Sequence, residues 1–131
     1  MAGGYVPAVL DHFARPRGLG RLADANGRGA AGELRDGDVR IEIAIRVERG
    51  RVAAARFRTF GCSAAIAASS VATVLIEGEP VEVARSLTPE AIDAALGGLP
   101  EERLYAPAMA ASAVRAAVAD YERGGVPDGG D

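Results

Sequence analysis

The sequence predicts an α+β domain, in which a small antiparallel sheet of two to three strands packs against helices from the C-terminal half of the chain. Three observations indicate this class. Apolar and charged residues alternate near the middle of the chain, which predicts a half-buried strand. A turn joins this segment to a second strand-like segment, and helical patterns follow. Strands that precede helices in this way are typical of α+β domains.

The composition limits the classes of protein to consider. The 131 residues are enough for a single domain, expected at 1–123, with a disordered Gly-, Pro- and Asp-rich tail at 124–131. The net charge of −3 argues against a nucleic-acid-binding protein, and the 15 basic residues, all arginine, exclude lysine-based phosphate or Schiff-base sites. The single cysteine excludes an internal disulfide. Without a membrane-spanning run or a secretory pattern, we expect no membrane association and a cytoplasmic protein.

The first third of the chain predicts one helix and a glycine-rich connection. Residues 5–14 are expected to be helical, with Pro7 in the first turn, and Pro16 ends the helix. The expected apolar face comprises Val6, Leu10, Phe13 and Ala14. Residues 18–37 predict a loop with at most a short strand at 30–34.

The clearest periodicity lies at residues 39–48, where every second residue is apolar. This pattern predicts a strand with one buried and one solvent-facing side. The buried side comprises Val39, Ile41, Ile43, Ile45 and Val47. Residues 48–51 predict a hairpin turn into a second strand at 52–60.

The remainder of the chain predicts four helices. The first spans residues 64–76 and ends at Gly78, and a short one follows at 80–85. The third begins at Thr88-Pro89, as N-cap and first residue, and the last spans 107–123. The expected apolar positions are Ala67, Val71, Val74 and Leu75 in the first helix, Ile92, Ala95 and Leu96 in the third, and Val114, Val118 and Tyr121 in the last.

Cys62 lies between the second strand and the first of these helices. Gly61 permits a sharp turn there, and Ser63 is the expected N-cap. The positive end of the helix dipole would then favour a Cys62 thiolate. A lone cysteine in an alanine-rich chain is also typical of a small buried apolar residue, so these residues alone leave both interpretations open.

Residues 56–70, Arg-Phe-Arg-Thr-Phe-Gly-Cys-Ser-Ala-Ala-Ile-Ala-Ala-Ser-Ser, resemble the signature of the iron–sulfur cluster assembly scaffold family, the IscU and NifU N-terminal-domain proteins. Segments 11–20, 37–39 and 116–121 resemble other parts of the family pattern in the same order, so the resemblance covers about residues 5–123. It implies an IscU/NifU-N-like fold of the SufE/NifU superfamily. It also implies a non-enzymatic role in iron–sulfur cluster assembly, with cysteine desulfurase or other assembly proteins as partners.

The resemblance further implies a [2Fe–2S] site, which is altered in this chain. The family's aspartate falls on Asp38 and its second cysteine on Cys62, and both are retained. Its first cysteine falls on Asp36, and its histidine–cysteine pair falls on Tyr105 and Ala106. Such clusters normally have four protein ligands, typically thiolates, so one thiolate with oxygen donors is expected to hold iron or a cluster weakly. Tyr105 is a weak donor at best and is expected to serve packing.

Three functions remain open at this point. A divergent scaffold would bind iron or a labile cluster through Cys62, Asp38 and Asp36, or share a cluster between two Cys62 thiolates of a homodimer. A pseudo-scaffold would bind the desulfurase or another partner without a cluster. An enzyme with Cys62 as nucleophile is disfavoured, because His12 lies in a distant helix and is expected to be exposed or hydrogen-bonded.

Two further segments have alternative interpretations. Without the resemblance, Asp36 and Asp38 would simply form a turn of common composition before a strand. Residues 99–103, Leu-Pro-Glu-Glu-Arg, fall on the family's Leu-Pro-Pro-Val-Lys segment, which docks a chaperone in some members. Two acids replace its middle residues, so we expect chaperone docking by this route to be impaired.

Overall fold

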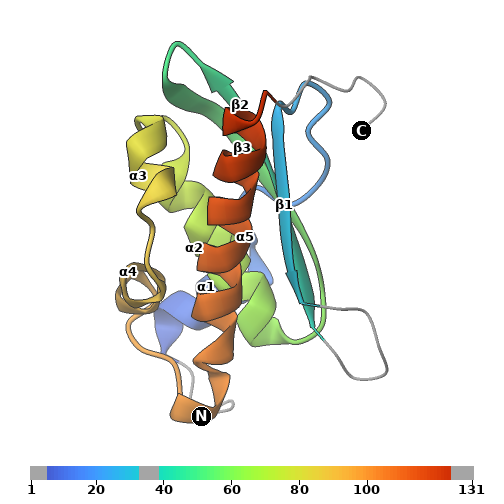
Figure 1. The fold of residues 1–131 in the computed structure, drawn as a ribbon. Coiled ribbons are helices and arrows are strands. Elements are labelled where there is room, and N and C mark those ends of the chain that lie inside the picture. Colours follow the sequence, from blue (N-terminus) through green and yellow to red (C-terminus); the bar gives the residue numbers. More distant parts are fainter. Residues whose placement is uncertain (1–5, 33–38, 125–131) are drawn as a thin grey trace.

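The computed structural model describes residues 6–32 and 39–124, which form three strands, five α-helices and one short 3₁₀ helix (Figure 1). The strands are β1 (Gly27–Gly32), β2 (Arg40–Glu48) and β3 (Arg51–Phe60). The helices are α1 (Pro7–Ala14), α2 (Ser63–Ile76), α3 (Val81–Arg85), α4 (Pro89–Ala95), η2 (Glu101–Arg103) and α5 (Tyr105–Glu122). The strands form an antiparallel sheet in the order β1-β2-β3, which confirms the predicted α+β class.

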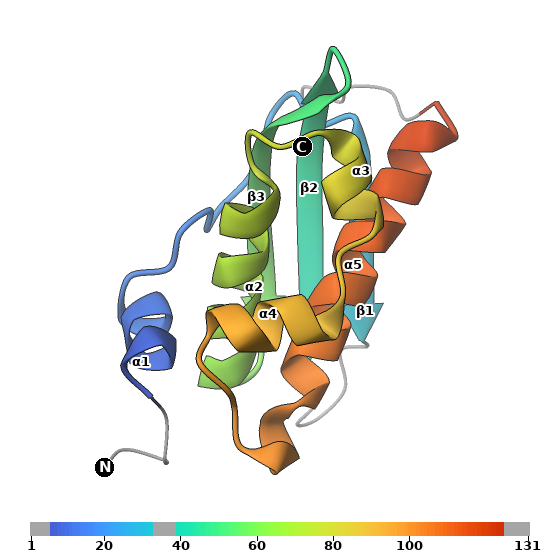
Figure 2. The same cartoon turned by 90° about the vertical axis from the view of Figure 1, so that its left-hand side faces the viewer.

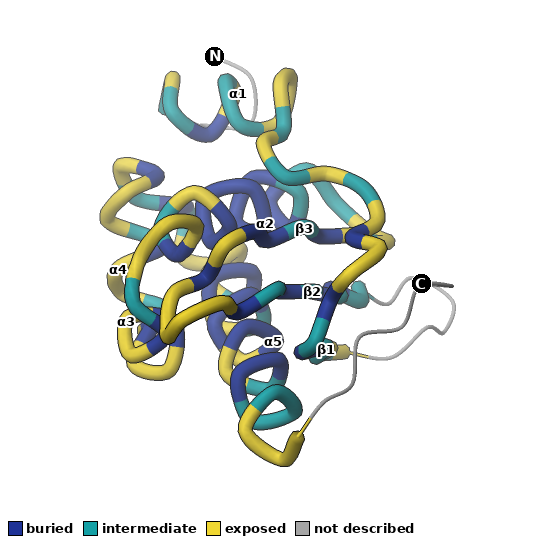
Figure 3. The backbone as a smooth tube through the Cα atoms, turned by 90° about the horizontal axis from the view of Figure 1, so that it is seen from above, coloured by how far each residue is buried: buried dark blue, intermediate teal, exposed yellow. Residues whose placement is uncertain are grey.

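Helices α2 to α5 lie on one side of the sheet (Figure 2), and the main core fills the space between these layers. The predicted alternation in β2 is confirmed, because Ile41, Ile43, Ile45 and Val47 are at most 5% exposed. Figure 3 shows the buried stretches of α2 and α5 facing those of the strands. Within residues 6–32 and 39–124, we find no helix with the length and apolarity needed to cross a bilayer.

Helix α5 lies directly on the backbone of β1, which has glycine at both contact positions. A Cβ atom at Gly29 would lie 2.3 Å from the Ala117 nitrogen and 2.5 Å from the Ala113 carbonyl oxygen. A Cβ atom at Gly27 would lie 2.5 Å from the Ala117 carbonyl oxygen. These spacings leave no room for a side chain, so the two glycines set the height of α5 above the sheet.

Several predicted details are wrong. The strand predicted at 30–34 lies at Gly27–Gly32 within the described residues, and the last helix begins at Tyr105, with Pro107 inside its first turn, where its missing N–H costs nothing. In α2, the predicted apolar residue Val74 is 51% exposed. Its neighbour Thr73 is buried instead, because the Thr73 hydroxyl donates to the Arg17 carbonyl oxygen.

The predicted apolar face of α1 is also wrong. Leu10 and Phe13 are 37% and 44% exposed, whereas Val9 is fully buried. Val9 and His12 lie three residues apart and therefore share a face of the helix. His12 contacts α2, and this contact turns the Val9 face inward.

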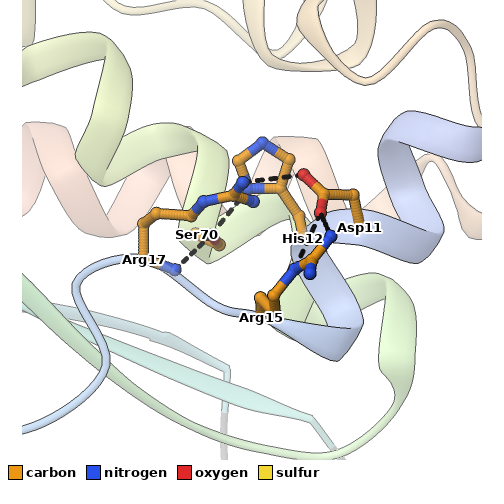
Figure 4. A network of polar contacts seen from close by, with 5 residues as sticks. All are labelled: Asp11, His12, Arg15, Arg17 and Ser70. Atoms are coloured by element: carbon orange, nitrogen blue, oxygen red, sulfur yellow. Dashed lines mark hydrogen bonds and ion pairs between the residues drawn. The ribbon is translucent and has the colours of Figure 1, made fainter.

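A polar network fixes α1 against α2 (Figure 4). The Ser70 hydroxyl of α2 accepts a hydrogen bond from the Arg17 backbone N–H at 2.8 Å and lies 2.7 Å from Nδ1 of His12. Asp11 accepts hydrogen bonds from Arg15 and Arg17. The prediction that His12 is hydrogen-bonded is therefore confirmed.

We expect His12 to make the protein less stable as the pH falls. Burial and the nearby charge of Arg17 lower the pKa of His12 below its ordinary value of 6.5. The unfolded chain therefore takes up this proton at a higher pH than the folded chain, and the free energy of unfolding declines as the pH falls from above 6.5 through the folded-state pKa. Denaturant unfolding across about pH 5 to 8 should show this decline, and it should be shallower in His12→Asn, whose amide oxygen still accepts from Ser70. Equal pH dependence in the two proteins would rule out His12 as its source.

Candidate functional site

Cys62 follows β3 and caps α2. Gly61, with φ +140°, makes the turn after the strand, and a Cβ atom at this residue would lie 2.8 Å from the Val39 side chain. The Cys62 backbone is extended, and its carbonyl oxygen accepts hydrogen bonds from the N–H groups of Ala65 and Ile66. The prediction of Ser63 as N-cap is therefore wrong, because these bonds start the helix one residue earlier.

The Cys62 thiol is partly buried and contacts a residue far away in the sequence. Its Sγ atom lies 2.7 Å from the hydroxyl oxygen of Tyr105, the first residue of α5 and 43 positions later in the chain. The start of α2 and the start of α5 therefore meet at one pair of polar side chains. Tyr105 is more than a packing residue, since its hydroxyl points at the thiol.

The surroundings of Cys62 favour its thiolate. Partial burial raises the pKa of the thiol, but four other influences outweigh burial and bring this pKa below its ordinary value. In order of size, they are the Tyr105 hydroxyl, the backbone N–H groups of Ala65 and Ala64, and the positive charge of Arg103. The N–H groups belong to the first turn of α2, where the helix dipole also favours a negative charge.

Tyr105 shows the opposite shift. Burial raises the pKa of its hydroxyl, and the hydrogen bond with Cys62 raises this pKa further, while Arg103 lowers it in part. The phenol therefore keeps its proton more firmly than an ordinary tyrosine, and it is the donor of this hydrogen bond when Cys62 is a thiolate. Sequence reasoning missed Arg103, whose only signal was its place two residues before Tyr105.

Tyr105→Phe should raise the pKa of the Cys62 thiol, because the variant removes a donor that stabilises the thiolate. The rate of alkylation by iodoacetamide as a function of pH measures this pKa, and the inflection should move to higher pH in the variant. Tyr121→Phe, at the other end of α5, is the matched control and should leave the profile unchanged. Identical profiles for wild type and Tyr105→Phe would show that the hydroxyl does not act on the thiol.

The other predicted site residues have different outcomes. Asp36 and Asp38 lie outside the described residues, so their place beside Cys62 stays a prediction. Ala106 is fully buried and carries no donor atom. Among residues 6–32 and 39–124, no three histidine, cysteine, aspartate or glutamate side chains gather into a group that could hold a metal ion. This part of the site offers one sulfur and one phenolic oxygen.

The segment that resembles a chaperone-docking motif lies just before Tyr105. Leu99 is 9% exposed, and its N–H donates to the Asp93 carboxylate at 2.8 Å. Glu101 and Glu102 are exposed in η2. The two replacing acids therefore lie at the surface, and impaired chaperone docking stays a prediction.

Comparison with known sequences finds relatives over nearly the whole chain. Residues 4–126 match the family model described as the NifU-like N terminal domain. The chain is 43% identical over 119 residues to iron–sulfur cluster assembly scaffold protein IscU 1 of Archaeoglobus fulgidus, covering 91% of this chain and 77% of that protein. It is 39% identical over 118 residues to IscU of Aquifex aeolicus, covering 89% and 75%. It is 50% identical over 114 residues to the nitrogen fixation protein NifU of Cereibacter sphaeroides, covering 87% of this chain but 46% of that protein.

Solved structures share the fold at lower identity. The N-terminal part of a NifU-like protein from Brucella abortus has a TM-score of 0.61 and 16% identity, covering 90% of this chain and 94% of that one. A putative scaffold protein for the SUF system from Fervidobacterium islandicum has a TM-score of 0.56 and 16% identity, covering 89% and 88%. These likenesses confirm the predicted IscU/NifU-N-like architecture.

Proposed function

The chain belongs to the NifU-like N-terminal domain family, and from this premise we propose that it serves iron–sulfur cluster assembly as a divergent, non-enzymatic scaffold. It would bind iron or a labile [2Fe–2S] cluster weakly through Cys62 and Asp38, with Asp36 as a further ligand. Relatives in Archaeoglobus fulgidus and Aquifex aeolicus are named scaffold proteins of this process. Iron and sulfide are the cargo of such a protein rather than its resident cofactor.

The contact between Cys62 and Tyr105 is the observation that carries this proposal. A thiol with a lowered pKa supplies the soft thiolate that iron–sulfur chemistry requires. A thiolate sulfur has several lone pairs, so it can bind iron while it still accepts the Tyr105 hydrogen bond. Hydrogen bonds of this kind orient a metal ligand and tune its donor strength. Partial exposure of Cys62 leaves the sulfur within reach of the cargo.

The neighbourhood of Gly61 supports the contribution of Asp38. The Val39 side chain packs so closely on Gly61 that a Cβ atom there would lie 2.8 Å from it. Val39 follows Asp38 in the chain, and Gly61 precedes Cys62. Val39 and Gly61 are in contact, and each is the sequence neighbour of a proposed ligand, Asp38 for the carboxylate and Cys62 for the thiolate.

The donor set explains why binding should be weak. Ala106 offers no ligand, and Tyr105 offers an oxygen that holds its proton firmly. One thiolate and carboxylate oxygens form a harder and smaller set than the four thiolates of a stable cluster. A homodimer that shares one cluster would supply two Cys62 thiolates as ligands instead of one, and the proposal includes this arrangement.

The alternative is a pseudo-scaffold that binds the cysteine desulfurase or another assembly protein without a cluster. The fully buried Ala106 favours this alternative, because one of the family's ligand positions is filled by a side chain that cannot bind metal. The two proposals differ in whether the function requires the Cys62 thiol.

Anaerobic titration with ferrous iron and sulfide separates them. The wild-type protein should develop visible charge-transfer absorption that a chelator removes readily, and Cys62→Ala should develop none. Ser63→Ala, one residue away, is the matched control and should behave as wild type. If the wild type stays colourless while desulfurase capture is unchanged in Cys62→Ala, the scaffold proposal fails and the binding module stands.

A further inference from the structure

The face of the sheet that lies away from the helices carries a hollow of about 350 Å³. One wall is the segment from Gly20 to Leu22, and the floor consists of residues from all three strands. Gly18 and Gly20 hydrogen-bond to Phe57 at the β3 edge, and the chain then reaches β1 by crossing this face (Figure 3). A second small core cluster fastens the crossing segment to the sheet; it comprises Leu22, Ala25 and Ala54, with Ala44 packed against it. The hollow is therefore built on a rigid base.

The hollow concentrates positive charge in an otherwise acidic chain. Its lining includes five arginines and one glutamate, namely Arg21, Arg28, Arg40, Arg56, Arg58 and Glu42. The lining thus carries a charge of +4, whereas the whole chain carries −3, so the rest of the chain carries −7. A concave site of one sign focuses the field and attracts ions of the opposite sign.

Part of this charge has no partner. Arg40 pairs with Glu42 at 2.9 Å, and Arg56 pairs with Glu77 at 3.1 Å. For the exposed side chains of Arg21 and Arg58, the described part of the chain provides neither an ion pair nor a hydrogen bond. Two guanidinium groups are therefore left to face a ligand.

We propose that this hollow binds a small, multiply charged oxyanion, a polyphosphate or a polycarboxylate. Guanidinium groups present planar pairs of donors that match the oxygens of phosphates and carboxylates. The volume falls in the range of small-molecule pockets, about 300–1,000 Å³. The small side chains of Ala30 and Ala44 keep the floor low, so a compact anion can lie across the strands between the arginines. The site is separate from Cys62 and does not depend on the scaffold proposal.

Isothermal titration of metal-free protein with tripolyphosphate and with citrate tests this proposal. We expect saturable binding of one anion per chain by at least one probe, and the stronger probe identifies the class. Arg21→Gln/Arg58→Gln should weaken binding by about tenfold or more, because two charged contacts are lost. Arg49→Gln/Arg51→Gln makes the same charge change at the hairpin end of β3, where Arg51 is the first residue of the strand. It should leave the affinity within about twofold, because the rise of a strand places Arg51 roughly 23 Å from Arg58, beyond the Debye length.

Two further variants, Arg58→Lys and Cys62→Ala, complete the test. Arg58→Lys keeps the charge but loses the planar donor pair, so its affinity should lie between those of wild type and the double variant. Cys62→Ala should bind as wild type, which separates this site from the scaffold site. Equal weakening in both double variants would mean diffuse attraction and would overturn the proposal. A hexaglutamate peptide serves as a third titrant. The proposal would also be overturned if neither tripolyphosphate nor citrate bound, or if only the hexaglutamate peptide bound.

Discussion

Replacing Asp36 and Ala106 with cysteine and Tyr105 with histidine should give a protein that holds a stable [2Fe–2S] cluster. The resemblance implies that Asp36 and Ala106 fall on cysteines of the family pattern and that Tyr105 falls on its histidine. With Cys62, the triple variant offers three thiolates and an imidazole, which are soft donors suited to iron–sulfur chemistry. Reconstitution under anaerobic conditions should give strong visible charge-transfer bands and about two irons per chain, as this cluster type requires.

The matched control substitutes the same three residues but introduces no thiolate. Asp36→Ser/Tyr105→Phe/Ala106→Ser should bind iron no better than wild type. Circular dichroism of both variants establishes that the fold survives, and Ala106 needs this check because it is fully buried. A triple cysteine–histidine variant that folds but stays colourless would show that the ligand positions no longer converge in this chain.

Gly29→Ala should lower the free energy of unfolding by about 3 kcal/mol, the upper part of the usual range for overpacking. The added methyl group would lie 2.3 Å from the Ala117 nitrogen and 2.5 Å from the Ala113 carbonyl oxygen. Both are backbone atoms of α5, which cannot rotate away as a side chain would. The helix must move off the sheet, and urea unfolding measures the cost.

The neighbouring residue provides the control for this change. Ala30 is exposed in the same strand, so Ala30→Ser adds an atom where there is room and should change the stability by less than about 0.5 kcal/mol. Because α5 begins at Tyr105, the Gly29→Ala variant should also loosen the contact with Cys62. A loss of stability no larger than that of Ala30→Ser would contradict the close packing of α5 on β1.

Local sequence patterns were sufficient where a single element determines its own structure. The alternation predicted the buried side of β2 from Ile41 to Val47, whereas Val39 precedes the strand and is only partly buried. Thr88 and Pro89 predicted the start of α4, where the Thr88 hydroxyl accepts from the Ala91 N–H at 3.1 Å. These signals involve residues only a few positions apart. The N-cap hydrogen bond and the side-chain alternation of a strand also act over only a few residues.

The predictions that failed depend on contacts between distant segments. The face of α1 follows from the contact of His12 with Ser70, 58 positions away. The exposed position of Val74 follows from the bond of Thr73 to Arg17, 56 positions away. Periodicity within a helix carries no information about which neighbour it will meet, so these orientations could not be read from the sequence.

The candidate site divides in the same way. Cys62 was placed correctly between β3 and α2, because the strand, the glycine and the helix are adjacent in the chain. Its bond to Tyr105 spans 43 positions and became visible only in the structure. The contributions of Asp36 and Asp38 stay predictions.

The central claim, that the Cys62 sulfur is the contact for iron, is tested most directly by X-ray absorption at the iron edge. The protein should be loaded anaerobically with ferrous iron and no sulfide, so that Cys62 supplies the one thiolate in the sample. We expect a sulfur neighbour in the first coordination shell of iron in the wild-type protein, and its loss in Cys62→Ala. A shell of oxygen and nitrogen alone in the wild type would contradict the claim.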